Sequence, residues 1–149
     1  METRNRTGLI LMVEDNLEVG SFVQNLLEGE DHEVCWISQP VRLGCKQLSW
    51  EGAVTRKLES VTTDQALLDV DLFPGGGDGR ELARLLHRLL PDLPITIMSG
   101  RSPAEVASLL HEHVIRCFVP KPLDADMLVR TISAALVTKE EVEQHLASD

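Results

Sequence analysis

The sequence has 149 residues, 43% of them hydrophobic and 26% charged, which is the balance of a folded chain of one-domain size and not of a disordered one. Asp and Glu number 24 against 14 Lys and Arg, so the formal net charge is −10. Such a charge repels phosphate backbones and acidic lipid surfaces, which argues against direct binding to nucleic acid and favours a basic partner or a bound cation.

The N-terminal segment and the cysteines indicate a cytoplasmic protein. The first apolar run spans only residues 8–13 and ends in Glu14-Asp15, so it is shorter than the hydrophobic region of a secretory signal. No run approaches the ~20 apolar residues that span a bilayer, so we expect no membrane insertion. An odd number of cysteines without a CxxC pair is typical of reduced thiols, and these are Cys35, Cys45 and Cys117.

Short apolar runs alternate with amphipathic segments along the chain. The runs expected to form strands are 9–13, 33–37, 66–68, 95–98 and 115–119. Helices are expected over 19–27, 50–60 and 82–89, then from 102–105 onward and over 124–136. Because strand and helix alternate five times, the pattern predicts the α/β class, with a doubly wound five-stranded parallel sheet between two helical layers.

Local signals mark the helix ends and the domain limits. Ser102-Pro103-Ala104-Glu105 has the pattern of a capping box with proline at the first helical position, and Asp124 is expected to cap the last helix. Residues 39–51 show no clean period and are interpreted as a long extended connection. We expect one domain over residues 8–137, with an N-terminal extension at 1–7 and a charged tail at 138–149.

Polar residues stand at the carboxyl ends of four of the expected strands. In an open parallel sheet these ends meet at one edge, and ligands bind there. The residues in question are Glu14 and Asp15 after the first strand, Asp69 and Asp71 after the third, Ser99 after the fourth and Lys121 after the fifth. The sequence therefore predicts a site in which carboxylates, a hydroxyl and an ammonium group converge.

This set of groups has a chemical logic. Three clustered carboxylates repel one another unless a cation lies among them, and an all-oxygen site suits Mg²⁺. Asp69 is then a carboxylate nucleophile for a phosphoryl group, whose charge Lys121 neutralises and to which Ser99 donates a hydrogen bond. Each residue alone has a simpler explanation, such as a helix cap, a turn or a solvated charge, but their joint position favours a site.

Four segments in chain order, ILMVEDN, ALLDVDL, ITIMSG and FVPKPL, resemble the receiver domain of two-component response regulators. The resemblance covers about residues 8–137 and implies the flavodoxin-like (βα)5 receiver architecture, here as a stand-alone domain. It makes Glu14 and Asp15 the acidic metal pair and Asp69 the phosphoacceptor. It also implies that the backbone carbonyl of Asp71 is a ligand of the metal.

The resemblance also implies a switch. Ser99 takes the position of the family's hydroxyl, Lys121 that of its phosphate-sensing lysine and Phe118 that of its switch aromatic, with a cis peptide bond between Lys121 and Pro122. A histidine kinase or a histidine phosphotransfer protein would phosphorylate Asp69 in the presence of Mg²⁺. Ser99 and Phe118 would then move inward and reshape a face that binds a downstream protein target.

Three features depart from the family pattern, and one is the stretch 39–51, which is longer than the family norm. The loop after Asp69 is longer than usual, with Phe73 and three glycines at 75–77, and Phe118 lacks the hydroxyl of the tyrosine that is common there. The simpler interpretation of Phe118 is a plain core residue of the fifth strand. A receiver phosphorylates itself and slowly hydrolyses the product, so a turnover enzyme is not implied.

Three alternatives stay open at this point. In a phosphatase of the haloacid-dehalogenase type, Asp69-Val70-Asp71 would be the DxD motif with Asp71 as general acid, although that motif normally lies near the start of the fold and leaves Glu14-Asp15 unexplained. An adaptor with a degenerate site would not bind Mg²⁺. A flavodoxin-like cofactor binder shares the fold, but the acidic edge would repel a flavin phosphate.

Overall fold

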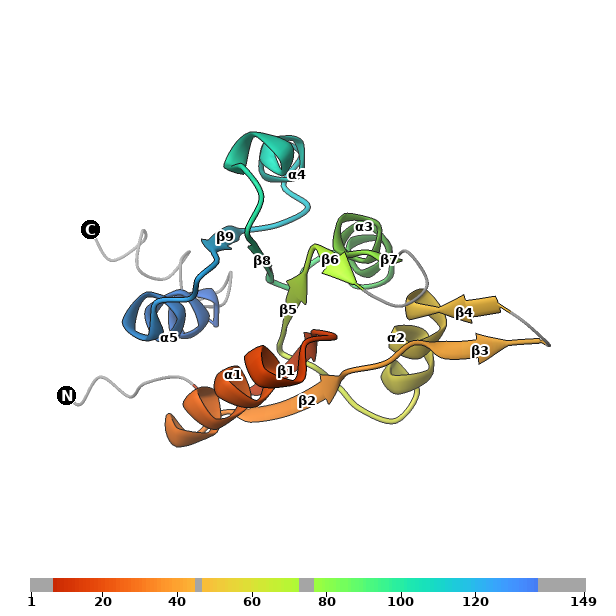
Figure 1. The fold of residues 1–149 in the computed structure, drawn as a ribbon, viewed down its shortest axis with the longest axis horizontal. Helices are drawn as coiled ribbons and strands as arrows, with labels where there is room; N and C mark the ends of the chain where they lie inside the picture. The colour runs from red at the N-terminus through yellow and green to blue at the C-terminus, as the bar shows by residue number, and fades with distance from the viewer. Residues whose placement is uncertain (1–6, 45–46, 73–76, 137–149) are drawn as a thin grey trace, which may run out of the picture.

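The centre of the molecule is a parallel sheet, seen nearly along its strands in Figure 1. The computed structural model describes residues 7–44, 47–72 and 77–136. Five strands lie in the order β2-β1-β5-β8-β9, and each neighbouring pair is parallel. They are β1 (Leu9–Val13), β2 (Glu33–Ile37), β5 (Gln65–Asp69), β8 (Ile95–Ser99) and β9 (Cys117–Pro120). The predicted fold class is confirmed.

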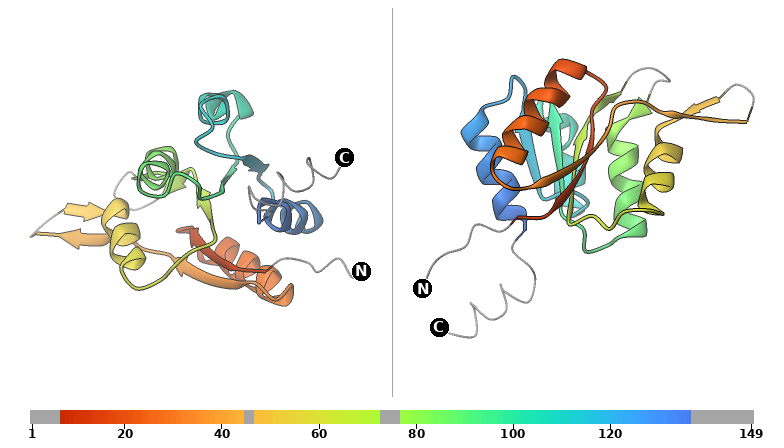
Figure 2. Two further views of the ribbon diagram at one scale, coloured as in Figure 1. Left: turned by 180° about the vertical axis from the view of Figure 1, so that it is seen from behind. Right: turned by 90° about the horizontal axis from the view of Figure 1, so that it is seen from below.

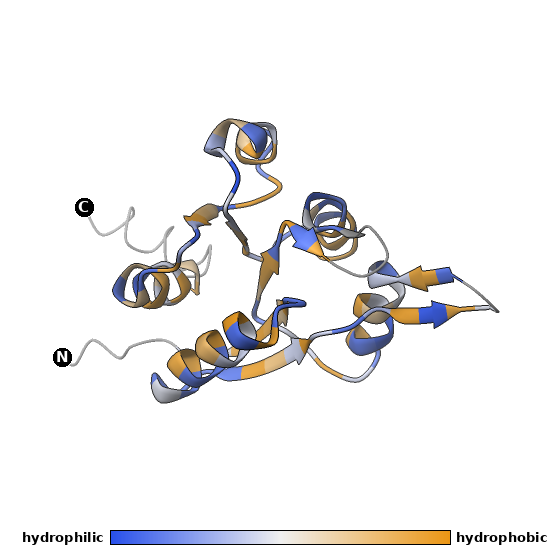
Figure 3. Ribbon diagram, in the orientation of Figure 1, coloured by the Kyte–Doolittle hydropathy of each residue, from blue (hydrophilic) through white to orange (hydrophobic). Residues whose placement is uncertain are grey.

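Helices cover both faces of this sheet, as Figures 1 and 2 show. Ile10 and Met12 pack in one apolar cluster with residues of α1 and α5, whereas Leu11 and Val13 pack in a second cluster with residues of α2, α3 and α4. Figure 3 shows the apolar strands between the two helical layers. The helices are α1 (Leu17–Gly29), α2 (Trp50–Leu58), α3 (Gly79–Leu89), α4 (Ala107–His111) and α5 (Ala125–Ala135).

The turn between β1 and α1 lies where the strand order reverses, because β1 is placed between β2 and β5. Ligands of open parallel sheets bind at this switch point, outside the carboxyl ends of the strands. Asn16 caps α1, since its Oδ1 accepts hydrogen bonds from the N–H groups of Glu18 and Val19, both at 3.0 Å. The cap is thus Asn16, and the Asp15 carboxylate remains available to the edge.

The predicted capping box at residues 102–105 is wrong in detail. Ser102 Oγ accepts from the N–H of Ala104 at 3.3 Å, but the Glu105 carboxylate lies 3.5 Å from Arg101 Nη1 and does not cap the backbone. The expected fourth helix is divided into a 3₁₀ turn, η1 (Pro103–Glu105), and the short α4. The division falls at Val106, whose φ of −110° and ψ of 1° interrupt the helical path.

The sequence predicts an extended connection over residues 39–51, but the structure has a β-hairpin there. Strands β3 (Val41–Leu43) and β4 (Gln47–Ser49) pair antiparallel, and Figures 1 and 2 show the ribbon projecting away from the main sheet. Each strand has only three residues. A run of three is too short for an alternating pattern to be recognised, so the apolar periodicity gives no sign of it.

A second small hairpin replaces the loop expected after Asp69. Strands β6 (Asp71–Leu72) and β7 (Gly77–Asp78) pair antiparallel, and the loop between them lies outside the described residues. Cys45 and the predicted tail at 138–149 also lie outside the described residues. Cys35 and Cys117 carry free thiols, as expected. Within the described ranges, no helix is long and apolar enough to cross a bilayer.

Candidate functional site

The structure brings the predicted site residues together at the carboxyl edge of the sheet. Asp69 and Ser99 are the last residues of β5 and β8, Glu14 and Asp15 follow β1, and Lys121 follows β9. Glu14, Asp69 and Ser99 are all buried, whereas Asp15 is half-buried. The parallel sheet explains this convergence, because every one of its strands ends at the same edge.

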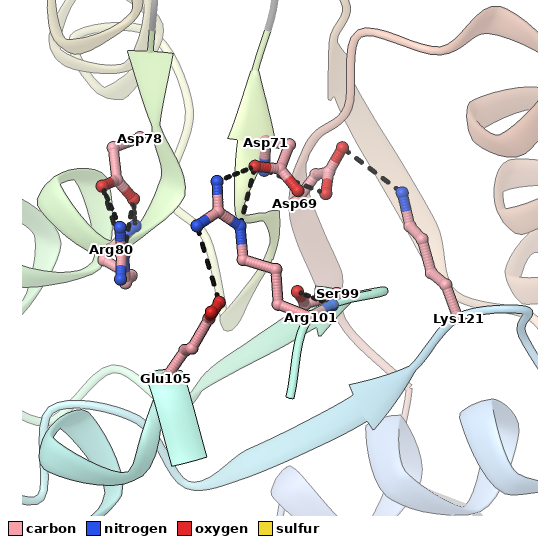
Figure 4. Close-up of polar contacts among 8 residues, drawn as sticks. All are labelled: Asp69, Asp71, Asp78, Arg80, Ser99, Arg101, Glu105 and Lys121. Atoms are coloured by element: carbon pink, nitrogen blue, oxygen red, sulfur yellow. Dashed lines mark hydrogen bonds and ion pairs between the residues drawn. The ribbon is translucent and has the colours of Figure 1, made fainter. Parts of the chain in front are cut away.

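Three of the carboxylates form one cluster. Glu14, Asp15 and Asp69 each offer an oxygen atom, and these atoms lie within 4.8 Å of one another. Lys121 Nζ reaches into the cluster, 2.8 Å from Glu14 Oε1 and 3.3 Å from Asp69 Oδ2 (Figure 4 shows the latter contact). The sequence predicts Lys121 beside a phosphoryl group on Asp69 but not its closer contact with Glu14.

The cluster is short of positive charge, and Glu14 shows this most clearly. Burial, together with the neighbouring Asp69, raises the pKa of Glu14 from 4.5 to about 8, although Lys121 acts in the opposite direction. Burial also acts to lower the pKa of Lys121, but its contacts with Glu14 and Asp69 outweigh this effect and raise it. At neutral pH the cluster therefore holds a proton or needs a cation.

The donor atoms fit a divalent cation with oxygen ligands. Glu14 Oε2 is buried and has no hydrogen-bond partner among the residues that the structure describes. An unpaired buried carboxylate oxygen is costly, and a metal ion would satisfy it. Mg²⁺ suits a site of a few carboxylates that leaves positions open for water and phosphate oxygens. Glu14, Asp15 and Asp69 are the residues that would hold it.

The side chain of Asp71 is not part of the cluster. Its Oδ1 accepts a hydrogen bond from Arg101 Nε at 3.0 Å, and the side chain is 57% exposed. The backbone N–H of Asp71 instead donates to Asp69 Oδ1 at 3.3 Å. The chain thus places the carboxylate of Asp71 outside the cluster and its backbone N–H beside Asp69, while metal ligation by its backbone carbonyl stays a prediction.

No family model matches the sequence. Among curated relatives, the sensor kinase/phosphatase CqsS of Vibrio cholerae is 26% identical over 84% of this chain and 17% of its own length. The nitrogen assimilation regulatory protein NtrX of Azorhizobium caulinodans is 26% identical over 87% of this chain and 26% of its own. The chain therefore spans about a sixth and about a quarter of these two relatives.

Solved structures decide the fold. A CheY-like response regulator receiver domain protein from Methanospirillum hungatei superposes with a TM-score of 0.73, at 22% identity, over 93% of this chain and 99% of its own. The fold is that of a response-regulator receiver domain. NtrX from Brucella abortus gives a TM-score of 0.76 at 21% identity, over 95% of this chain and 30% of its own.

The receiver fold does not favour the phosphatase alternative. Asp69 ends the third strand of the main sheet in chain order, and not the first as in the haloacid-dehalogenase pattern. Asp71, which that chemistry would use as a general acid, has its carboxylate in an ion pair with Arg101. The Asp71 carboxylate is thus engaged by a guanidinium group and lies outside the acidic cluster.

Ser99 and Phe118 occupy different environments. Ser99 Oγ accepts a hydrogen bond from the backbone N–H of Arg101 at 2.9 Å, so the hydroxyl keeps its own proton for donation to another group. Phe118 is half-buried on β9 and packs against the apolar cluster on the α3 side of the sheet. The expected cis peptide bond between Lys121 and Pro122 is present.

Two glycines, which sequence reasoning misses, allow neighbouring elements to pack closely against the site. A Cβ atom on Gly79, the first residue of α3, would lie 2.0 Å from the backbone oxygen of Asp69. A Cβ atom on Gly20 would lie 1.9 Å from Cζ2 of Trp36, whose Nε1 donates to the backbone oxygen of Glu14 at 2.9 Å. Trp36 thus lies near the carboxyl edge. The only sequence signal is the place of each glycine within or just before an expected helix.

Proposed function

We propose that residues 8–137 form a receiver domain that accepts a phosphoryl group on Asp69 from a histidine kinase or a histidine phosphotransfer protein. One observation carries the proposal: a buried aspartate at the centre of the edge has carboxylates on one side, a lysine 3.3 Å away and a serine hydroxyl on the next strand. The regulator and kinase names of the curated relatives support the same conclusion.

The chemistry is an in-line transfer. A carboxylate oxygen of Asp69 attacks the phosphorus atom of a phosphohistidine, the P–N bond breaks and the histidine nitrogen leaves with the electron pair. Lys121 stays beside the Asp69 carboxylate and neutralises charge on the phosphoryl oxygens, while the Ser99 hydroxyl turns to donate to one of them. Mg²⁺, when bound by Glu14, Asp15 and Asp69, supplies the remaining positive charge.

Phosphorylation of Asp69 would act on other proteins by changing one face of the domain. As Ser99 turns toward the phosphoryl group, it leaves the backbone N–H of Arg101 and frees the start of the segment that leads to η1 and α4. Phe118 lies on the neighbouring strand, and its movement toward the vacated space would alter the face formed by α4, β9 and α5. A downstream protein that recognises this face is the partner that the proposal requires.

Binding of Mg²⁺ should depend on Asp15 and not on the side chain of Asp71. Outer-shell partners of a metal ion typically change its affinity by about 10- to 100-fold, so removal of the Asp15 ligand in Asp15→Ala should weaken binding by at least tenfold. In Asp71→Ala the backbone carbonyl remains, and the change should be under about threefold. A Mg²⁺ titration followed by Trp36 fluorescence measures both, and equal losses would indicate direct ligation by the Asp71 carboxylate.

The proposal is tested against the phosphatase alternative by counting turnovers. The protein is incubated with Mg²⁺ and an excess of either acetyl phosphate or a chromogenic phosphomonoester, and the product released per chain is measured. We expect incorporation of no more than one phosphoryl group per chain and slow loss of that group. Release of many equivalents from the phosphomonoester would instead establish a phosphatase, and an absence of Mg²⁺ binding would indicate a degenerate adaptor.

A further inference from the structure

Arg101 contacts residues of the candidate site through both its backbone and its side chain. Its backbone N–H donates to Ser99 Oγ at 2.9 Å. Its guanidinium Nε donates to Asp71 Oδ1 at 3.0 Å, and its Nη1 lies 3.5 Å from Glu105 in η1. Figure 4 shows this guanidinium on the Asp71 side of Asp69, while Lys121 approaches from the opposite side. Neither the sequence pattern nor the proposed transfer gives Arg101 a role.

The contacts of Arg101 form a continuous polar path from the phosphoacceptor to η1. Asp69 Oδ1 accepts from the backbone N–H of Asp71, the Asp71 carboxylate accepts from Arg101, and the same guanidinium reaches Glu105. The nearby Arg80 has no such freedom, because its Nε and Nη2 both donate to Asp78 on its own side of the hairpin. Arg101 is therefore shared by two exposed carboxylates, those of Asp71 and Glu105, on the Asp71 side of Asp69.

We propose that Arg101 is a second phosphoryl-binding residue, which Asp71 and Glu105 hold aside until Asp69 is phosphorylated. The inference rests on the proposed function, because it assumes a phosphoryl group on Asp69. Phosphorylation adds a charge of about −1.5 to −2 and three strong acceptor oxygens close to the present partner of Arg101. A guanidinium group binds such oxygens in a bidentate manner, more strongly than it binds an exposed carboxylate.

The ion pairs that Arg101 now makes are easy to exchange. The side chain of Arg101 is 41% exposed, and those of its partners Asp71 and Glu105 are 57% and 47% exposed. Ion pairs this exposed contribute little net stability because water and salt screen them. When Arg101 turns to the phosphoryl group, it leaves Glu105, and η1 loses its tie to the site. Arg101 would thus report phosphorylation to α4 by a route separate from Lys121.

The test compares two substitutions that break the same ion pair from opposite ends. Beryllofluoride, added with Mg²⁺, serves as the phosphoryl probe because it coordinates a carboxylate oxygen, and its affinity is measured by titration. Arg101→Ala should weaken beryllofluoride binding by about three- to tenfold, because a charge-assisted contact is lost. Glu105→Gln should instead tighten it by about twofold, because a competitor for the guanidinium is removed. Arg101→Lys should fall between Arg101→Ala and wild type.

A structural ion pair gives a different result. If Arg101 and Glu105 only brace the loop, both variants change beryllofluoride affinity in the same direction or not at all, and either outcome overturns the inference. Thermal melts of both variants establish that they are folded. Amide exchange over residues 103–111 gives a second readout: beryllofluoride should increase exchange there in wild type and should do so less in Arg101→Ala, which keeps only the route through Ser99. If wild-type protein itself binds no beryllofluoride, the proposed function is wrong and this inference falls with it.

Discussion

Replacement of Gly79 by alanine is expected to lower the free energy of unfolding by about 3 kcal/mol, the upper end of the usual cost of overpacking. The new Cβ atom would lie 2.0 Å from the backbone oxygen of Asp69 and 2.8 Å from Cα of Val70. Both are main-chain atoms of the central strand or of the residue after it, so neither can give way as a flexible side chain would. Either helix α3 must therefore move off the strand, or the backbone at Asp69 must shift.

Gly29→Ala is the matched control, since Gly29 ends α1 and a Cβ atom there would meet no atom within 4 Å. Alanine forms helix better than glycine, so this variant should be as stable as wild type or more stable by up to about 1 kcal/mol. Urea unfolding measures both variants. A Gly79→Ala protein as stable as Gly29→Ala would show that α3 does not hold the backbone of Asp69 in place.

The second large effect concerns pH and Glu14. In the absence of metal, burial raises the pKa of Glu14 from 4.5 to about 8 in the folded protein, while the unfolded chain keeps the ordinary value. Between these two values the folded state binds more protons than the unfolded state. The contribution of Glu14 is therefore complete below pH 4.5, and stability decreases as the pH rises, by up to about 1.4 kcal/mol per pH unit.

A comparison of wild type with Glu14→Gln isolates this contribution. Other groups also contribute to the pH dependence, His32 among them because burial lowers its pKa, but they are common to both proteins and cancel in the difference. Urea unfolding in EDTA at pH 5.5 and pH 8 should show a loss of stability in wild type relative to Glu14→Gln at the higher pH. Identical pH dependences would mean that Glu14 is ionised in the folded protein throughout.

The apolar pattern is sufficient to predict the main sheet but not the two small hairpins outside it. Strands 9–13 and 33–37 are predicted with their observed ends, and 9–13 is the clearest case because its continuous apolar run can be buried only between two helical layers. The β3–β4 and β6–β7 hairpins have strands of two or three residues, which carry no period. The pattern predicts the fourth helix as one piece because it contains no sign that Arg101, itself paired with Asp71, draws Glu105 away from the cap.

The candidate site is likewise predictable from the sequence only in part. The expected strand ends alone place Asp69, Ser99 and Lys121 at one edge, because the topology of a parallel sheet determines where its strands end. The contact of Lys121 with Glu14 and the position of Arg101 depend on how far long side chains reach across that edge. No sequence spacing encodes such reach. The close approach of Gly79 to Asp69 is likewise a backbone contact between elements.

Phosphorylation of Asp69 is the central claim, and intact-mass measurement after incubation with acetyl phosphate and Mg²⁺ tests it most directly. Wild-type protein should gain one phosphoryl group, and it should gain none when EDTA replaces Mg²⁺. Asp69→Asn keeps the size of the side chain but removes the nucleophilic carboxylate, so it should gain none in either condition. Incorporation by Asp69→Asn at the wild-type level would contradict the account.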